Sequence, residues 1–442
     1  MMLLFGLLSL FLCLFLKVAY TSISFMEKQG VHGPKPHFLL GNIVEVGSLV
    51  SMTTSNDMDS IHHDIVSRLL PHYLLWSKQY GKRFIYWVGN EPRICLTDPK
   101  MIKELLSSKY SNLCGKSWLQ QQNSKHFIGR GLLMANGQDW HHQRHIVASA
   151  FMADKLKLRE EKRIFDLLTS LQNLCAQSSR RLCLPGSRFF PSKYNRDIKA
   201  LKMEVERLLM EIIQSRKDCA EIGRSTSYGN DLLGMLLSET QKKRANGFGF
   251  NLQLLMDECK TFFFTGHETT ALLLTWTVML LATNPDWQEK VRAELLQVCN
   301  GETPSPEQLS KLTTLNMVIN ESLRLYPPAS LLPRMVFEDI KLGDLEIPKG
   351  LSIWIPVLAI HHNKELWGED SYAPGLNFMP FAARPRNCVG QAFALMESKI
   401  ILAMMISQFR FTISENYRHA PIIVLTLKPK HGVQICLEPL SL

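Results

Sequence analysis

The sequence predicts a mainly α-helical protein with a small β region. Apolar residues recur at helical spacing without a break from residue 252 to residue 283, and a second long helical pattern starts at Gln391. Short runs rich in β-branched and aromatic residues, bounded by turn residues, lie at 83–96, 345–356 and 408–437. With 442 residues and 46% hydrophobic content, the chain can form one large domain or two to three smaller ones.

Composition narrows the possible functions. The formal net charge of +10 suits an anionic membrane, an acidic protein or nucleic acid as a partner. No run of Lys and Arg and no RNA-binding aromatic motif accompanies this charge, so we expect no nucleic-acid partner. The ten cysteines are too sparse for a small disulfide scaffold, and the absence of a CxxC pair argues against a zinc module.

The first 20 residues are almost wholly apolar, broken by Ser9 and Lys17. A helix of this length spans about 30 Å and can cross a bilayer core. A cleaved signal peptide is the alternative, but it would carry positive charge before the apolar run and a small-x-small site after it. Lys17, Lys28 and Lys35 instead come late in the run or after it, which predicts a cytosolic orientation for the rest of the chain.

The chain therefore divides into three predicted parts. Residues 1–24 form an uncleaved, single-pass transmembrane anchor. Residues 25–42 form a Pro-rich hinge, stiffened by the prolines of Gly33-Pro34-Lys35-Pro36. Residues 43–442 form the folded domain on the cytosolic side.

Three elements are predicted at the start of the domain. A hairpin joins residues 83–88 to residues 93–96 across Gly89-Asn90-Glu91-Pro92. Apolar residues at helical spacing predict a helix from Pro99 to Ser107. The polar, Gly-containing stretch from Trp118 to Gly131 is predicted to be a loop.

A helix is expected to start after Asn136-Gly137 and to carry Trp140 and Arg144 on one face, because residues four apart are neighbours on a helix. Alone, such a pair is more often a cation–π or surface contact than part of a binding site. A further amphipathic helix is expected from Ile198 to about Ser215, with its charged residues in solvent.

The long helical pattern at 252–283 ends at Asn284-Pro285 and could be a membrane span or a buried core helix. Charged residues lie too centrally for a bilayer, which favours the buried helix. They are Asp257, Glu258, Lys260, His267 and Glu268. In the middle of the helix, Gly266 permits close approach or a local opening, and Glu268 and Thr269 could relay protons. A Thr-Thr pair in a helix is by itself ordinary.

Glu321 and Arg324 can pair on one face of a helix that ends at Leu325-Tyr-Pro-Pro328. The Glu-x-x-Arg pattern has little value alone, because the chain contains others. Two features single out this pair: the helix that carries it ends at Leu325-Tyr-Pro-Pro328, and it lies between the Thr motif and Cys388.

The stretch Phe381-Ala-Ala-Arg-Pro-Arg386-Asn-Cys388-Val-Gly390 comes directly before the second long helical pattern. Free amides at a helix N-terminus favour negative charge, so this position is expected to lower the pKa of the Cys388 thiol. A thiolate can be the axial ligand of a haem iron. Phe381 would pack beside the sulfur, Arg386 would meet a haem propionate, and Gly390 would allow close approach. A lone cysteine there is more often a small buried hydrophobe.

These motifs, in this order along the chain, resemble the cytochrome P-450 superfamily of haem–thiolate monooxygenases, whose haem loop reads Phe-x-x-Gly-x-Arg-x-Cys-x-Gly. The resemblance implies the P-450 fold, with a long central helix over haem b, and Cys388 as the iron ligand. It implies that Glu268 and Thr269 are catalytic and that Glu321 and Arg324 form a structural pair. It also implies a set of haem contacts, namely Trp140, Arg144, Arg334, Phe381, Arg386 and Gly390.

The resemblance further implies a small-molecule substrate, electrons from NADPH through NADPH–cytochrome P-450 reductase, and an endoplasmic reticulum membrane location. The substrate walls would include Trp118, Phe127, Phe264 and Leu331. Residues 115–122, 127–135 and 184–195 are similar to plant cytokinin hydroxylases, which convert isopentenyladenine-type cytokinins to trans-zeatin forms. The alternatives are another small apolar substrate such as a terpenoid or fatty acid, a haem–thiolate isomerase or dehydratase, and a non-catalytic remnant.

Three departures from the family pattern predict a compromised enzyme. Helices between the Trp140 helix and residue 165 are missing, with the join near 155–162, which should uncover part of the face formed by residues 272–281 of the long helix. The stretch 371–377 is short and lacks the arginine that would complete the network with Glu321 and Arg324. Arg384 stands where the haem loop has Gly, at a cost of about 1–3 kcal/mol if that position needs a positive φ. Little haem incorporation and weak turnover are therefore expected.

Overall fold

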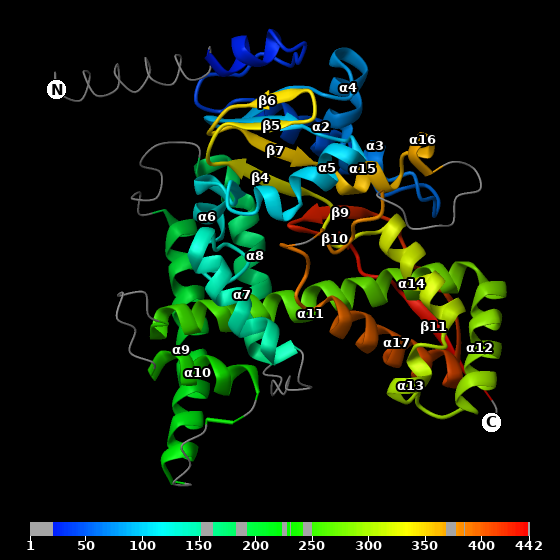
Figure 1. The fold of residues 1–442 in the computed structure, drawn as a ribbon. Helices are drawn as coiled ribbons and strands as arrows, with labels where there is room; N and C mark the ends of the chain where they lie inside the picture. Colours follow the sequence, from blue (N-terminus) through cyan, green and yellow to red (C-terminus); the bar gives the residue numbers. More distant parts are fainter. Residues whose placement is uncertain are drawn as a thin grey trace.

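The computed structural model describes residues 21–151, 162–182, 192–222, 228–229, 231–241, 250–367, 377–383 and 385–440. Helices form most of these residues, as predicted (Figure 1). A sheet region lies at one end of the molecule together with α2 to α5, α15 and α16, the long helix α11 crosses the middle, and most of the other helices lie around it. This mainly helical arrangement with small sheets is the fold class that the sequence predicts.

The helices vary from single turns to long rods. Those that precede α11 are α2 (Ile43–Thr54), α3 (Val66–Leu69), α4 (Pro71–Tyr80), α5 (Pro99–Leu105), η1 (Ser108–Tyr110), α6 (Trp118–Ser124), α7 (Gly137–Phe151), α8 (Lys162–Leu182), α9 (Lys193–Ile222) and α10 (Leu232–Gln241). The others are α11 (Leu252–Thr283), α12 (Pro285–Cys299), α13 (Pro306–Leu309), α14 (Thr313–Leu325), α15 (Val357–His361), α16 (Lys364–Trp367) and α17 (Gln391–Gln408).

The strands form one larger sheet and three hairpin-like pairs. The larger sheet has the order β1 (Ile85–Val88), β2 (Glu91–Cys95), β7 (Ser352–Ile355), β4 (Leu332–Val336) and β3 (Cys114–Gly115). Only β2 and β7 pair in parallel within it. The two-stranded pairs are β5 (Ile340–Leu342) with β6 (Leu345–Ile347), β8 (Phe409–Ile413) with β11 (Ile435–Pro439), and β9 (Pro421–Val424) with β10 (Thr426–Pro429).

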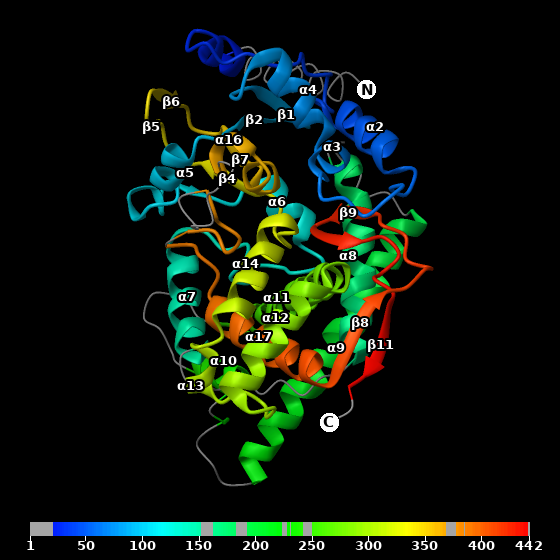
Figure 2. The ribbon, with the colours of Figure 1, turned by 90° about the vertical axis from the view of Figure 1, so that its right-hand side faces the viewer.

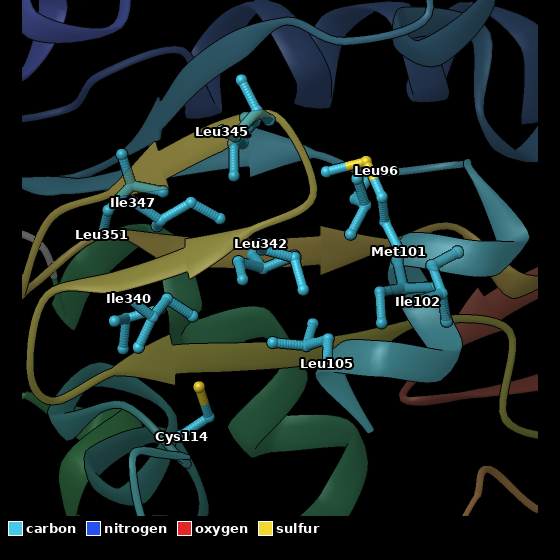
Figure 3. Close-up of a cluster of buried hydrophobic side chains, with 14 of the residues drawn as sticks. Leu96, Met101, Ile102, Leu105, Cys114, Ile340, Leu342, Leu345, Ile347 and Leu351 are labelled. Carbon is cyan, nitrogen blue, oxygen red and sulfur yellow. The ribbon is translucent and has the colours of Figure 1, made fainter. Parts of the chain in front are cut away.

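The larger sheet has its own hydrophobic core, formed where α5 and the β5–β6 pair pack against it (Figure 3). Met101 and Ile102 of α5 contact side chains from segments more than two hundred residues later in the chain, such as Leu342 and Leu345. This packing fixes β3 and β4 side by side, which matters for the site described below.

Helix α11 is the buried helix that the sequence predicts. Asn251 caps it by accepting a hydrogen bond from the backbone N–H of Leu254, and Asn284 ends it before Pro285. Most of residues 272–281, part of which was expected to lose its cover, are buried: Trp276 and Met279 are both 0% exposed, whereas Leu274 is half-buried. They are covered by α14 and the C-terminal strands on one side and by α17 on the other, as the views along and across α11 illustrate (Figure 2).

Helix α17 is the less protected element. Its sequence is apolar around most of its circumference, yet most of its side chains are half-buried and Met404 is 45% exposed. The described chain passes from α7, which ends at Phe151, to α8, which begins at Lys162. The predicted join near 155–162 lies largely outside the described residues, as do residues 371–376 and Arg384.

One secondary-structure prediction is wrong and one segment is only partly described. The stretch that begins at Trp118 forms the helix α6 rather than a loop, because Ser117 and Gln120 form a reciprocal capping box at its start. Of the predicted anchor, only residues 21–24 are described, and they begin a short helix. No helix in the described part of the chain is both long enough and apolar enough to cross a bilayer.

Candidate functional site

The Cys388 loop lies between residue 377 and α17, and its own backbone closes it. The N–H of Cys388 donates to the carbonyl of Phe381 at 2.9 Å, and Ala382 supports the bend with a φ of 57°. Gly390 is the N-cap of α17, so Cys388 lies just before the helix as predicted. With a φ of −91°, Gly390 does not need the left-handed conformation.

The thiol of Cys388 differs from its prediction in one respect. Burial raises its pKa, although the N–H of Gly390 and the charge of Arg144 act in the opposite direction. The side chain is open to one side, yet the surrounding protein removes enough water for desolvation to exceed the effect of the helix N-terminus. This direction is opposite to the lowered pKa that the helix position alone predicts.

Two residues of α7 fasten this loop. Arg144 donates to the backbone carbonyl of Asn387 at 2.7 Å and to its side-chain Oδ1 at 3.1 Å. Trp140 is 5% exposed, and the guanidinium of Arg386 lies 4.4 Å from the centre of its ring. The helix face that carries Trp140 and Arg144 thus meets the Cys388 loop, as predicted. Arg144 contacts Asn387 of the loop.

Three cations gather beside the loop. The antiparallel register pairs Gly115 with Met335, so Lys116 follows β3 next to Arg334 of β4. Arg334 and Arg386 both lower the pKa of Lys116, which burial brings to about 7. Burial also lowers the pKa of Arg334 and of Arg386 to about 10. None of these cations has a salt-bridge partner among the carboxylates that the structure describes.

Arg386 has unpaired hydrogen-bond donors in the described part of the chain. Its Nη1 donates to the carbonyl of Ala135 at 3.1 Å. Its Nε and Nη2 are buried and have no hydrogen-bond partner in the described part of the chain. Leaving such donors unpaired is costly, and carboxylates are their strongest acceptors.

The residues present fit a haem. The three cations could neutralise the two propionates, and a cysteine sulfur stands open beside them. On α11, Gly266 is exposed, and a Cβ added there would meet no described atom within 4 Å. An open glycine on the long helix, cations without carboxylate partners among the described residues and an accessible cysteine sulfur are compatible with a haem that has a thiolate ligand.

The predicted proton-relay residues lie in an uninterrupted helix. α11 continues through Gly266 without the local opening that the sequence allowed. The hydroxyl of Thr269 donates to the carbonyl of Thr265 at 2.7 Å, so it is oriented by its own helix. The carboxylate of Glu268 accepts a hydrogen bond from Thr426 of β10 at 2.9 Å.

Glu321 and Arg324 form the predicted pair, at 2.6 and 2.8 Å. Arg324 also donates to the carbonyl of His361 at 3.0 Å and lies over the ring of Trp367 at 5.5 Å. Glu321 is half exposed, so the missing arginine of the stretch 371–377 does not leave it as a buried charge without a partner.

The four predicted substrate residues occupy different surroundings. Phe127 and Phe264 are buried and meet edge to face at 4.5 Å. Leu331 is partly buried against the aromatic cluster around Tyr326. Trp118 is 64% exposed at the start of α6. The structure therefore brings Phe127 and Phe264 together but not the whole set.

Sequence reasoning missed Lys116, Asn136, Asn387 and Thr426. Asn136 fixes Lys116 by accepting from its N–H at 2.8 Å and donating to its carbonyl at 2.9 Å. The stretch around Lys116 carried a family resemblance, but only the pairing of β3 with β4 brings this lysine to the two arginines. No local signal pointed to Thr426.

Comparisons with known proteins agree with this geometry. The family model described as "Cytochrome P450" matches residues 31–180 and 156–437. A cytokinin hydroxylase from Arabidopsis thaliana is 60% identical over 500 aligned positions, covering 97% of each chain. A second Arabidopsis cytokinin hydroxylase is 58% identical over 511 positions, covering 98% of each chain. Cytochrome P450 709B1 of the same plant is 34% identical over 490 positions, covering 94% of this chain and 93% of its own. This chain belongs to the cytochrome P450 family and is a cytochrome P450 monooxygenase.

Proposed function

We propose that this monooxygenase hydroxylates the isoprenoid side chain of isopentenyladenine-type cytokinins and so forms trans-zeatin types. The observation that carries the proposal is the 60% and 58% identity, over almost the whole chain, to two proteins named cytokinin hydroxylase. In the balanced reaction, substrate, dioxygen, NADPH and one proton give the alcohol, water and NADP+.

Cys388 would hold the haem iron, and Lys116, Arg334 and Arg386 would hold the propionates. The bound haem supplies the activation of dioxygen. The chain's own residues keep Cys388 in place through the contacts of Arg144 and Asn387. The carboxylate of Glu268 would carry protons inward along α11, and the hydroxyl of Thr269 would receive them there.

A substrate wall would form around Phe127 and Phe264, whose edge-to-face contact offers a rigid apolar surface to an isoprenoid chain. Leu331 and Trp118 complete the set of proposed substrate residues on the strength of the family resemblance. We keep one alternative, in which the pocket accepts another small apolar substrate such as a terpenoid or a fatty acid.

The electrons would come from NADPH through NADPH–cytochrome P-450 reductase. A hollow of about 670 Å³ lies beside the Cys388 loop. Its described lining contains two cations and no carboxylate, which suits an acidic partner. The lining residues are Lys103, Ser107, Ser108, Arg144, Ala383, Pro385 and Asn387.

The location would be the endoplasmic reticulum membrane, with residues 1–24 as the anchor, residues 25–42 as the hinge and residues 43–442 in the cytosol. The apolar run and the lysines that follow it support this proposal. Protease treatment of microsomes tests it, because a cytosolic domain is digested without detergent. Protection of the domain would contradict the orientation.

The chain is also proposed to be internally shortened near 155–162. Its alignment to a relative runs over 500 positions, which exceeds its own 442 residues. The half-buried apolar side chains of α17 support the loss of a covering segment. Most of α11 remains covered. We therefore expect the shortening to lower the stability of the protein through the incomplete cover of α17. Inserting the relative's segment should raise the thermal midpoint, and an unchanged midpoint would reject the shortening as a defect.

The substrate assignment is tested by titrating the purified, full-length protein with isopentenyladenosine monophosphate while the haem spectrum is recorded. A saturable spectral shift and an NADPH-dependent hydroxylated product are expected. A response to a terpenoid or fatty acid together with none to the cytokinin would select the alternative. Product formation without NADPH would indicate an isomerase or dehydratase, and absence of haem would indicate a remnant.

A further inference from the structure

Glu268 lies at the middle of α11, and its hydrogen-bond partner comes from the far end of the chain. The hydroxyl of Thr426, the first residue of β10, donates to Oε1 of Glu268 at 2.9 Å. Thr426 is 5% exposed and Glu268 is half-buried, so the bond is partly shielded from water. A hydrogen bond from a buried neutral donor to a carboxylate is stronger than one between neutral groups.

The threonines of α11 itself do not serve Glu268. The hydroxyls of Thr261, Thr265 and Thr269 each donate to the carbonyl four residues earlier, at 2.9, 2.8 and 2.7 Å. A hydroxyl has one proton to donate, so these three are committed to their own helix. Thr426 is therefore the donor that orients Glu268 within the described part of the chain.

Thr426 is held firmly enough to orient another group. The indole Nε1 of Trp276, two turns further along α11, donates to the carbonyl of Leu427 at 3.2 Å. The N–H of Leu427 donates to the carbonyl of Pro328 at 3.1 Å, and its side chain is 0% exposed. The strand that carries Thr426 is thus tied to α11 and to the end of α14.

We propose that Thr426 is a positioning residue for proton delivery: it fixes Oε1 of Glu268 and leaves Oε2 to take up and release protons beside Thr269. The inference rests on the monooxygenase reaction of the proposed function but not on the identity of the substrate. Without the Thr426 hydroxyl, the carboxylate samples other rotamers, and fewer reaction cycles find it in place.

Three variants test this in the full-length protein. Thr426→Val removes the hydroxyl at nearly constant volume, and Thr426→Ser retains it. Thr277→Val is the matched control, because Thr277 is also buried on this core and its hydroxyl donates only to the carbonyl of Leu273 within α11.

The first readout requires neither substrate nor turnover. Carbodiimide labelling of carboxyl groups, measured by mass spectrometry, reports how freely Glu268 reacts. Losing one hydrogen bond should raise its labelling about two- to tenfold in Thr426→Val, and not in Thr426→Ser or Thr277→Val. Unchanged labelling in Thr426→Val would overturn the assignment.

The second readout is product formed per NADPH consumed, with hydrogen peroxide measured in parallel. Thr426→Val should lower this ratio about three- to tenfold, Thr426→Ser should keep it, and the carbon-monoxide spectrum should show equal haem content. Raised labelling with an unchanged ratio would overturn the positioning role. If no cytokinin product forms with any variant, the hydrogen peroxide yield per NADPH still decides for or against Thr426, whereas the substrate proposal alone fails.

Discussion

Glu258 provides the sharpest test of how α11 is built into the molecule. It is 0% exposed, and both of its carboxylate oxygens accept from the N–H of Leu132, at 3.1 and 3.0 Å. Burial raises its pKa to about 8. Its neighbour Asp257 faces the ammonium of Lys260 at 2.7 Å and accepts from the N–H of Arg130 at 2.9 Å.

We predict that Glu258→Gln becomes progressively more stable relative to the wild type as the pH rises. A folded-state pKa of about 8 lies above the unfolded value near 4.5, so Glu258 contributes stability below pH 4.5 that is lost as the pH rises through 8. Between pH 5 and pH 8 the loss amounts to about 3–4 kcal/mol, and the glutamine variant avoids it. Burying the extra amide donor adds a cost that does not depend on pH.

The assay is the thermal or urea unfolding midpoint of both proteins at pH 5, 6, 7 and 8. The difference in midpoint between them should grow with pH by several degrees or its urea equivalent. Asp257→Asn is the matched control, because it breaks the buried pair with Lys260. It should be less stable than the wild type at every pH, by about 3–5 kcal/mol.

A difference between Glu258→Gln and the wild type that stays flat from pH 5 to pH 8 would refute the reasoning. It would mean that Glu258 is ionised at little cost, and that the two hydrogen bonds from Leu132 or water compensate for its burial. If the unfolding midpoints of Asp257→Asn and Glu258→Gln depended on pH in the same way, the stability would not depend on whether the buried carboxylate has a cationic partner. That result would also refute the reasoning.

Three further outcomes are expected. Cys388→Ala should lose the thiolate-type spectrum of the reduced carbon-monoxide complex, whereas Cys436→Ala, at an exposed position, should retain it. Lys116→Met should weaken haem binding about tenfold, while Lys125→Met should not. Without haem, Lys116→Met should become more stable relative to the wild type as the pH falls from the ordinary lysine pKa of 10.5 to about 7, and the advantage should stay constant below pH 7, because burial lowers the folded-state pKa of Lys116 to about 7. Thr269→Ala should keep haem binding but yield less product per NADPH, and an unchanged yield would count against its role.

Local sequence signals were sufficient to predict the bounds of the helices that carry the proposed catalytic residues. The predicted bounds of α11 are those observed, because apolar spacing, the Asn251 cap and Pro285 all act within a few residues. The start of α17 after Gly390 follows from the same kind of signal. The missed helix α6 also has one, since Ser117 and Gln120 have the spacing of a capping box.

The parts that could not be predicted depend on which distant segments meet. Lys116 joins Arg334 only through the pairing of β3 with β4, and Thr426 meets Glu268 only because β10 packs on α11. The raised pKa of Cys388 depends on how much protein surrounds the sulfur, which the helix position does not reveal. Long-range register and burial are set by the whole core, whereas caps and periodicity are set by neighbours.

The charges of α11 exclude a membrane span, and the structure gives each of them a partner from another part of the chain. Asp257 and Glu258 bind the backbone of residues 130–132, just after Phe127 of the proposed substrate wall. Gly129 and Gly131 leave no room for a side chain there, because an added Cβ would come within 2.2 Å of Asp257 or Thr261. Two turns beyond Thr261, Glu268 binds Thr426. One helix thus positions both the substrate loop and the acid proposed to deliver protons, so a change in α11 should disturb binding and coupling together.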